Sequence, residues 1–213
     1  MLTTNTLTSI ILTRHEEKHM KRKPKNPITK IRTGTGDSGS TYLHNPDVSK
    51  ASDIVQFAGD LDEASASLGF VDIDHSHISC ETVDIQIQMN GMLNQTKEIL
   101  FAIGAMVHSD QARNDYQAVL DEYVELVSDG IESVTHLAQE HGFLIPLEGF
   151  IVPDKSNAPE MFARAVVRRA ERSAVKSKQD WAVPTLNVMS DFLFLIAWHN
   201  SKTLHQWLGF DTE

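Results

Sequence analysis

Cysteine is almost absent from this chain, since Cys80 is the only one among 213 residues. A lone cysteine excludes a disulfide within the chain and is typical of proteins in a reducing compartment. Long apolar runs are also missing, and none approaches the roughly 18 residues that a membrane span requires. The apolar segment 7–12 is followed by Glu16 and Glu17, which disfavours a secretion or transit signal. We therefore expect a cytoplasmic protein without a membrane segment.

Strand-like sequence is equally scarce, because alternating runs of Val, Ile and Thr are nearly absent. Apolar residues recur instead at helical spacing. Gly142 is a helix stop, and Pro184 suits the first turn of a helix. The sequence predicts an all-α fold, a five-helix antiparallel bundle, with helices over about 49–73, 79–108, 113–141, 158–178 and 184–208.

Basic residues are scarce outside the first 32 positions. Those positions hold eight of the 19 Lys and Arg residues and two acids, and the remaining 181 residues hold 11 bases against 27 acids. We expect residues 1–27 to form a mobile basic arm and residues 28–213 to form one helical domain. So acidic a domain has no general basic face for nucleic acid. Four of its 11 bases fall within nine residues: Arg164, Arg168, Arg169 and Arg172.

Metal-ligand spacing is also scarce. A di-iron bundle needs Glu-x-x-His on two helices, and this motif occurs once in the chain, at Glu16 and His19 within the expected arm. Glu132 and His136 are four residues apart, and a lone pair of this kind is more typical of a solvated helix surface. We expect no metal ion held by protein ligands alone.

The segment 32–41 contains Gly34-x-Gly36-x-x-Gly39, which matches a dinucleotide-binding fingerprint on paper. A true fingerprint follows an apolar strand and opens a helix. Here the preceding segment is basic and broken by prolines, and Pro46 follows the loop. Two interpretations remain: a plain surface turn, or a loop whose N–H groups and hydroxyls hold phosphate oxygens.

The segment 158–178 has one polar stripe, because Arg164, Arg168 and Glu171 lie within about 60° of one another on a helix. The stripe is either a solvated surface of ion pairs or a clamp for phosphate oxygens. Two other positions bear on this choice. Asp62 shares its helix face with small residues, which favours close approach of another helix, and Asn187 and Asp191 are four residues apart.

Six segments in this order resemble the ATP:cob(I)alamin adenosyltransferases of the propanediol-utilisation type: TGDSGST (35–41), VSK (48–50), GDLDE (59–63), FIVP (150–153), RAVVRRAER (164–172) and LNVMSDFLF (186–194). The resemblance spans roughly residues 28–205. It implies a homotrimer of five-helix bundles with active sites between subunits. The implied activity is transfer of the 5′-deoxyadenosyl group of ATP, with Mg²⁺, to cob(I)alamin. The implied partners are a flavoprotein reductase and an adenosylcobalamin-dependent enzyme.

The resemblance also implies residue roles. Arg168 would contact the phosphates and ribose of ATP beside Glu171 and Asn187. Asp62 would pair with Arg164, and Phe150 would displace the lower axial ligand of cobalamin. The triphosphate would be held by Lys50 and by a loop that includes Thr35, Gly36, Asp37, Gly39, Ser40 and Thr41.

One position departs from the family pattern. Gly34 stands where family members carry Lys or Arg, and the nearest preceding cations are Lys30 and Arg32. The loss of one charged contact to phosphate costs about 1–3 kcal/mol. The alternative function is therefore a relative that binds cobalamin or nucleotide as a sensor or carrier without adenosyl transfer.

Overall fold

The computed structural model describes residues 34, 36–43, 45–74, 83–140, 147–201 and 206–208. The expected N-terminal arm, 1–27, lies outside these residues, as does Thr35. The chain divides into two units, Met1–Ser38 and Gly39–Glu213. The fold below is that of the second unit.

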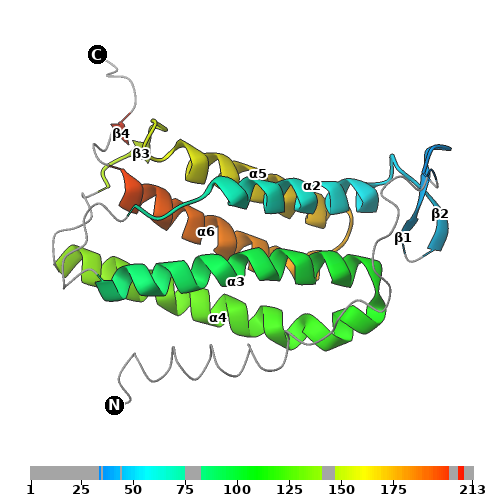
Figure 1. Ribbon diagram of the computed structural model, residues 1–213, viewed down its shortest axis with the longest axis horizontal. Helices are drawn as coiled ribbons and strands as arrows, with labels where there is room; N and C mark the ends of the chain where they lie inside the picture. The colour runs from blue at the N-terminus through cyan, green and yellow to red at the C-terminus, as the bar shows by residue number, and fades with distance from the viewer. Residues whose placement is uncertain are drawn as a thin grey trace. The chain divides into compact units, whose positions relative to one another are not determined.

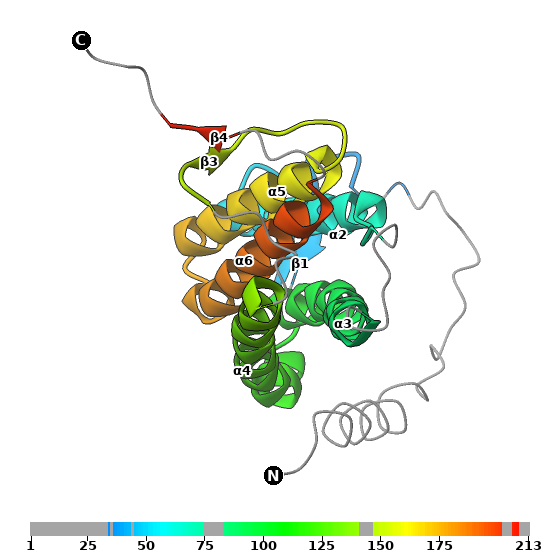
Figure 2. The ribbon, with the colours of Figure 1, turned by 90° about the vertical axis from the view of Figure 1, so that its left-hand side faces the viewer.

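Five long helices make up this unit, as the sequence predicts: α2 (Asp53–Ser67), α3 (Val83–His108), α4 (Asp110–Glu140), α5 (Ala158–Lys176) and α6 (Val183–Asn200). Each packs against two neighbours, in the closed order α2, α3, α4, α6, α5 and back to α2. Figure 2, which looks along the helices, shows α6 between α5 and α4. The all-α bundle is therefore confirmed.

The sequence of α6 explains why it is a core helix. Eleven of its 18 residues are buried, among them Phe192, Leu193 and Ile196. The segment Asp180–Asn200 is long and apolar enough to cross a membrane, but 61% of the most apolar window is buried inside the bundle. This burial is what a central helix of a bundle requires.

Alanines on α5 let its neighbours approach closely. Ala163, Ala170 and Ala174 are fully buried. The pairs α5–α6 and α5–α2 have the most extensive contacts of all the helix pairs. A second close approach joins α3 and α4, because a Cβ added to Gly130 would lie 2.5 Å from the sulfur of Met92. The bundle is thus held at short interhelical distances by small residues.

Several helix boundaries differ from the prediction, and α2 is one of the shorter helices, spanning Asp53–Ser67 rather than about 49–73. α4 begins at Asp110 rather than near Arg113, and the hydroxyl of Ser109 accepts a hydrogen bond from the N–H of Ala112 (3.3 Å), as an N-cap residue does. α6 ends at Asn200, so the prediction of a helix to residue 208 is wrong. Ser201 has extended backbone angles, and the chain beyond it contributes a strand.

Two small antiparallel sheets lie at opposite ends of the bundle (Figure 1). β1 (Ser40–Leu43) pairs with β2 (Asn45–Ser49) at the end where α2 begins. β3 (Phe150–Ile151) pairs with β4 (Gln206–Trp207) at the end where α5 begins. Two short 3-10 turns, η1 (Leu68–Phe70) and η2 (Asp180–Ala182), follow α2 and precede α6.

Candidate functional site

The polar stripe of α5 runs beside α6. The guanidinium of Arg164 lies over the ring of Phe194, 5.3 Å from its centre. Because α5 and α6 are antiparallel (Figure 1), each step from Arg164 toward the end of α5 is a step toward the start of α6. Arg168 and Glu171 therefore lie at about the level of Asp191 and Asn187. The predicted residues thus occupy matching levels of two adjacent helices.

Arg164 is held in an unusual environment. Burial lowers the pKa of its guanidinium, the charge of Arg168 lowers it further, and Asp191 acts in the opposite direction. Its Nε atom is buried and has no hydrogen-bond partner among the described residues. A buried N–H of a charged group normally has an acceptor, so this atom needs a partner outside the described residues.

Beside the stripe, Asn187 and Asp191 of α6 are exposed, whereas Arg168 and Glu171 of the stripe are half-buried. The carbonyl oxygen of Arg168 accepts a hydrogen bond from the exposed Arg172 (2.9 Å). Arg172 thus points its charge back along the same helix. The stripe thus presents cations and an amide at an open surface.

The opposite side of α5 carries a second polar cluster that sequence reasoning missed. Asp60 of α2 is 3% exposed and accepts hydrogen bonds from Gln56 (2.9 Å) and from the hydroxyl of Ser173. Arg169 places its Nε 3.5 Å from Asp60 and also pairs with Glu63. This cluster fixes the rotation of α5 against α2, with Arg169 directed toward α2.

Asp62 is exposed, so the buried aspartate of α2 is Asp60. The reason is the helical period, which places Asp62 about 200° around the helix from Asp60. Within the described part of one chain no ion pair joins Asp62 to Arg164. The predicted pairing of these two residues stays a prediction.

The glycine loop is described in two parts because the division between the units falls within it. In the first, Gly34 has a φ of +74° and its carbonyl accepts a hydrogen bond from the N–H of Asp37 (3.3 Å). Gly36 is half-buried and Asp37 is exposed. An L side chain at position 34 would be strained, which gives a backbone reason for glycine at this position.

The second part belongs to the bundle unit. Gly39 has a φ of +85° and accepts a hydrogen bond from the N–H of Lys50 (3.0 Å). Ser40 and Thr41 then pair with β2, and Lys50 is exposed in the turn after it. Lys176 near the end of α5 pairs with Asp53 at the start of α2 (2.7 Å). The hairpin therefore lies at the end of the bundle that also holds the end of α5.

Phe150 lies at the other end of the bundle, on β3. Its side chain is 74% exposed, and its ring centre is 6.3 Å from that of Trp207. The neighbouring Ile151 is 5% exposed, as the alternation of a strand requires. An exposed aromatic ring held on a paired strand is suited to contact a flat apolar ligand.

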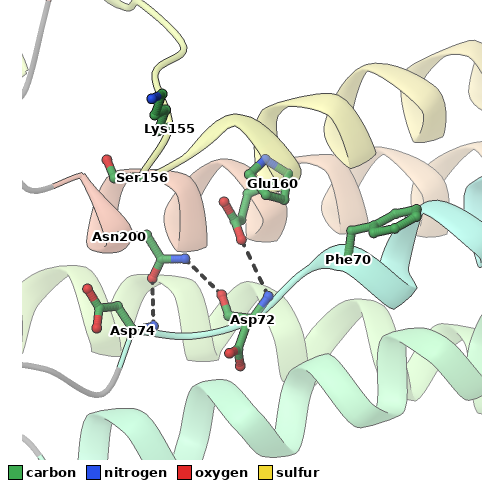
Figure 3. A pocket seen from close by; sticks show the side chains of 8 residues that line it. Phe70, Asp72, Asp74, Lys155, Ser156, Glu160 and Asn200 are labelled. Carbon is green, nitrogen blue, oxygen red and sulfur yellow. Dashed lines mark hydrogen bonds between the residues drawn. The ribbon is translucent and has the colours of Figure 1, made fainter.

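A pocket of about 470 Å³ lies near this end and was not predicted. Figure 3 shows the side chains of Glu160 and Asn200 reaching the backbone of Asp72. Asn200 donates to the carbonyl of Asp72 (2.8 Å) and accepts from the N–H of Asp74 (2.9 Å). These bonds fasten the chain after α2 to the end of α6. The pocket is lined by Phe70, Asp72, Asp74, Lys155, Ser156, Pro159, Glu160 and Asn200.

Glu160 is the notable acid of this pocket. It is 2% exposed, and burial raises the pKa of its carboxyl group. The N–H of Asp72 donates to its Oε1 (3.4 Å), while its Oε2 has no partner among the described residues. No signal in the sequence singled it out, because a glutamate in the first turn of a helix is usually a solvated residue.

Comparisons with known proteins point to one family. The sequence profile of the cobalamin adenosyltransferase family matches residues 31–200. The chain is 29% identical over 181 residues to the corrinoid adenosyltransferase of Bacillus subtilis (strain 168), covering 79% of this chain and 84% of that protein. It is 28% identical over 187 residues to the corrinoid adenosyltransferase of Mycobacterium bovis, covering 80% and 88%.

Solved structures support the fold. A variant of a PduO-type ATP:corrinoid adenosyltransferase from Lactobacillus reuteri, complexed with ATP, is similar with a TM-score of 0.53 and 20% identity, covering 79% of this chain and 93% of that chain. A second variant, complexed with cobalamin and ATP, has a TM-score of 0.53 and 21% identity, covering 80% and 92%.

Proposed function

Because the chain belongs to the cobalamin adenosyltransferase family, it is a corrinoid adenosyltransferase, and we propose that its active site includes the polar stripe along α5 and α6. The enzyme transfers the 5′-deoxyadenosyl group of ATP to cob(I)alamin and releases triphosphate. The observation that carries the site is the row of Arg164, Arg168 and Glu171 beside Asn187, with a buried Arg164 Nε that lacks an acceptor within the described chain.

The chemistry requires little from acid or base side chains. The electron pair of Co(I) attacks the 5′ carbon of ATP, the bond from that carbon to the phosphate oxygen breaks, and a cobalt–carbon bond forms. No oxidant or reductant enters this step. The protein contributes by holding the two substrates in line and by stabilising the charge that grows on the triphosphate.

Arg168 is the residue to which we assign the main phosphate contact. It is half-buried, it belongs to the open stripe, and its guanidinium is not used in the Asp60 cluster. Glu171 and Asn187 would orient the nucleotide from either side. Arg is suited to this role because its planar donors match phosphate oxygens in pairs.

The triphosphate loop completes the nucleotide site in this proposal. Thr35, Gly36, Asp37, Gly39, Ser40 and Thr41 would supply backbone N–H groups and hydroxyls, and Lys50 would add a charge. Mg²⁺ in proteins is usually bound by a few carboxylates together with substrate phosphates, and no cluster of three ligating side chains occurs among the described residues. The ion is therefore expected to enter on the triphosphate.

Phe150 is assigned to the corrinoid. Its exposed ring is suited to the lower face of the macrocycle, where it would exclude the axial base. Without that base, Co(II) accepts an electron more readily, because axial donation raises the energy of the orbital that the electron enters. This role concerns formation of Co(I), and the role of Arg168 concerns ATP.

The assembly we propose is a homotrimer with sites between subunits. Asp62 is exposed on α2, and the Nε of Arg164 on α5 has no partner among the residues that the structure describes, so the two are suited to pair across a subunit boundary. A cytoplasmic location is consistent with the single cysteine. A flavoprotein reductase that supplies Co(I) and an enzyme that consumes adenosylcobalamin remain the expected partners.

The test uses two arginines on one helix. With MgATP and chemically reduced cob(I)alamin, wild-type protein should form the light-sensitive adenosyl product. Arg168→Ala should lower kcat/KM about 10- to 100-fold, mainly through KM for ATP, because one charged hydrogen bond contributes about 1.5–3 kcal/mol. Arg172→Ala, the exposed control one turn away, should stay within about twofold. Equal effects of the two substitutions would refute the site.

A further inference from the structure

β4, which follows α6 in the chain, pairs with β3, the strand that carries Phe150. β4 pairs with β3 in antiparallel register, with Phe150 opposite Trp207 and Ile151 opposite Gln206. The two strands lie side by side in both views of the bundle (Figures 1 and 2). Two residues on each strand form too short a ladder to be stable alone, so other contacts must hold it.

Gln206 supplies such a contact with one side-chain oxygen. Its Oε1 accepts hydrogen bonds from the backbone N–H groups of Glu148 (2.5 Å) and Gly149 (2.7 Å). These are the two residues immediately before Phe150. A single carbonyl therefore fixes the peptide groups that lead into the strand, and it does so from a residue 57 positions away from Gly149.

Gly149 shows how tightly the two segments approach. A Cβ at this position would lie 2.6 Å from the carbonyl oxygen of Trp207 and 2.8 Å from the side chain of Leu208. Such distances are not sterically allowed against backbone. Only glycine at position 149 lets β4 come close enough for the Gln206 oxygen to reach both N–H groups.

The alternation of β3 then decides where the aromatic ring points. Ile151 is 5% exposed and anchors the strand, while the Phe150 side chain is 74% exposed. The ring of Trp207 lies beside that of Phe150, tilted by 31°. The ring of Phe150 is thus presented outward from a backbone that Gln206 and Trp207 hold on the other strand.

We propose that Gln206 is a positioning residue for Phe150, and that its bonds to Glu148 and Gly149 keep the Phe150 ring where it excludes the axial base of the corrinoid. This inference rests on the role proposed above for Phe150. A ring on a loose loop would compete poorly with the base, because the base is tethered to the corrinoid and returns whenever the ring moves away. Small displacements of positioning groups have large effects on reactive geometry.

The experiment measures the axial ligand of Co(II) directly. Full-length protein is mixed with cob(II)alamin and MgATP, and the EPR spectrum reports whether a nitrogen is bound to cobalt through its superhyperfine splitting. In Gln206→Ala the fraction of Co(II) without the axial nitrogen should fall about tenfold, while KM for ATP in the assay with supplied cob(I)alamin should change less than about twofold. Gln139→Ala, at an exposed position near the end of α4, is the matched control and should match the wild type.

A conservative variant separates this role from general stability. Gln206→Glu keeps an oxygen that accepts both N–H bonds and should retain at least half of the wild-type base-free fraction. Gln206→Asn is shorter by one methylene and should behave like Gln206→Ala, which keeps the test available if the alanine variant does not fold. A wild-type fraction in Gln206→Asn or Gln206→Ala, or failure of Gln206→Glu to restore it, would overturn the inference.

The wild-type protein separates failure of the proposed function from failure of the role of Phe150 and of the role of Gln206. If it turns over cob(I)alamin but shows no Co(II) without axial nitrogen, the role of Phe150 is refuted, and the role of Gln206 with it. If it does not turn over cob(I)alamin at all, the proposed function itself is refuted. If it does both, the Gln206 variants alone decide the inference.

Discussion

The two aspartates of α2, Asp60 and Asp62, should separate stability from activity. Asp60 is 3% exposed, and it accepts from Gln56 and Ser173 and pairs with Arg169. Asp62, two positions away, is exposed. Alanine substitution at each position removes the same carboxylate from the same helix, so the difference between the two variants isolates the effect of environment.

The magnitude for Asp60→Ala follows from its partners. Hydrogen bonds to a charged acceptor contribute about 1.5–3 kcal/mol each, but Gln56 is exposed and Arg169 is 42% exposed, so water replaces part of what they lose. The hydroxyl of Ser173 regains the least hydrogen bonding from water. We expect a loss of about 3 kcal/mol, which corresponds to about 6–12 °C in Tm for a chain of this size. Asp62→Ala should stay within about 0.5 kcal/mol, as exposed substitutions usually do.

Activity should show the opposite order. If Asp62 pairs with Arg164 of another subunit, Asp62→Ala should lower kcat at least about tenfold with cob(I)alamin and MgATP, since the lost ion pair corresponds to about 1.4 kcal/mol or more. Asp60→Ala, assayed well below its Tm, should keep more activity than Asp62→Ala. Thermal unfolding by circular dichroism and the adenosylation assay give the two readouts. Equal Tm losses in both variants, or full activity in Asp62→Ala, would refute this reasoning.

Three further substitutions test separate features. Burial raises the pKa of Glu160 above its ordinary value of 4.5, so the ionised acid destabilises the folded state. Glu160→Gln should therefore raise Tm at pH 7 by about 2–4 °C. Thermal scans at several pH values should show that this gain shrinks as pH falls toward 4.5. Gly34→Lys should change KM for ATP by less than about fivefold, because left-handed strain of about 1–2 kcal/mol offsets a phosphate contact; a larger gain would mean that the φ of +74° is not required. Tyr123→Phe should cost about 1 kcal/mol in urea unfolding without loss of turnover, since it removes the buried hydroxyl 2.7 Å from Thr96 but leaves the bond of Thr96 to Met92.

The sequence predicted the helices well because each carries its own signal. The apolar spacing of α2 and α3 and the alanines and arginines of α5 are local patterns that a window of one helix reveals. The end of α6 was missed for a different reason. Trp207 continues the apolar sequence of α6, but Gln206 and Trp207 pair with β3, and a partner about 57 residues away in sequence leaves no trace in a local window.

The site shows the same division. Clustered arginines on α5 are visible in the sequence, whereas the choice between Asp60 and Asp62 as the buried residue depends on how α2 is rotated against α5. The pocket around Glu160 was missed because it joins the end of α2, the start of α5 and the end of α6. Such sites are set by packing between distant segments, and no motif in one segment indicates them.

Adenosyl transfer by the purified chain is the decisive measurement for the proposed function. Wild-type protein with MgATP and chemically reduced cob(I)alamin should consume the Co(I) absorption band and yield adenosylcobalamin and triphosphate in equal amounts, with many turnovers per chain. The light sensitivity of the product identifies the cobalt–carbon bond. Binding of ATP and cobalamin by calorimetry, without loss of the Co(I) band or release of triphosphate, would contradict the account and leave a binding protein without transferase activity.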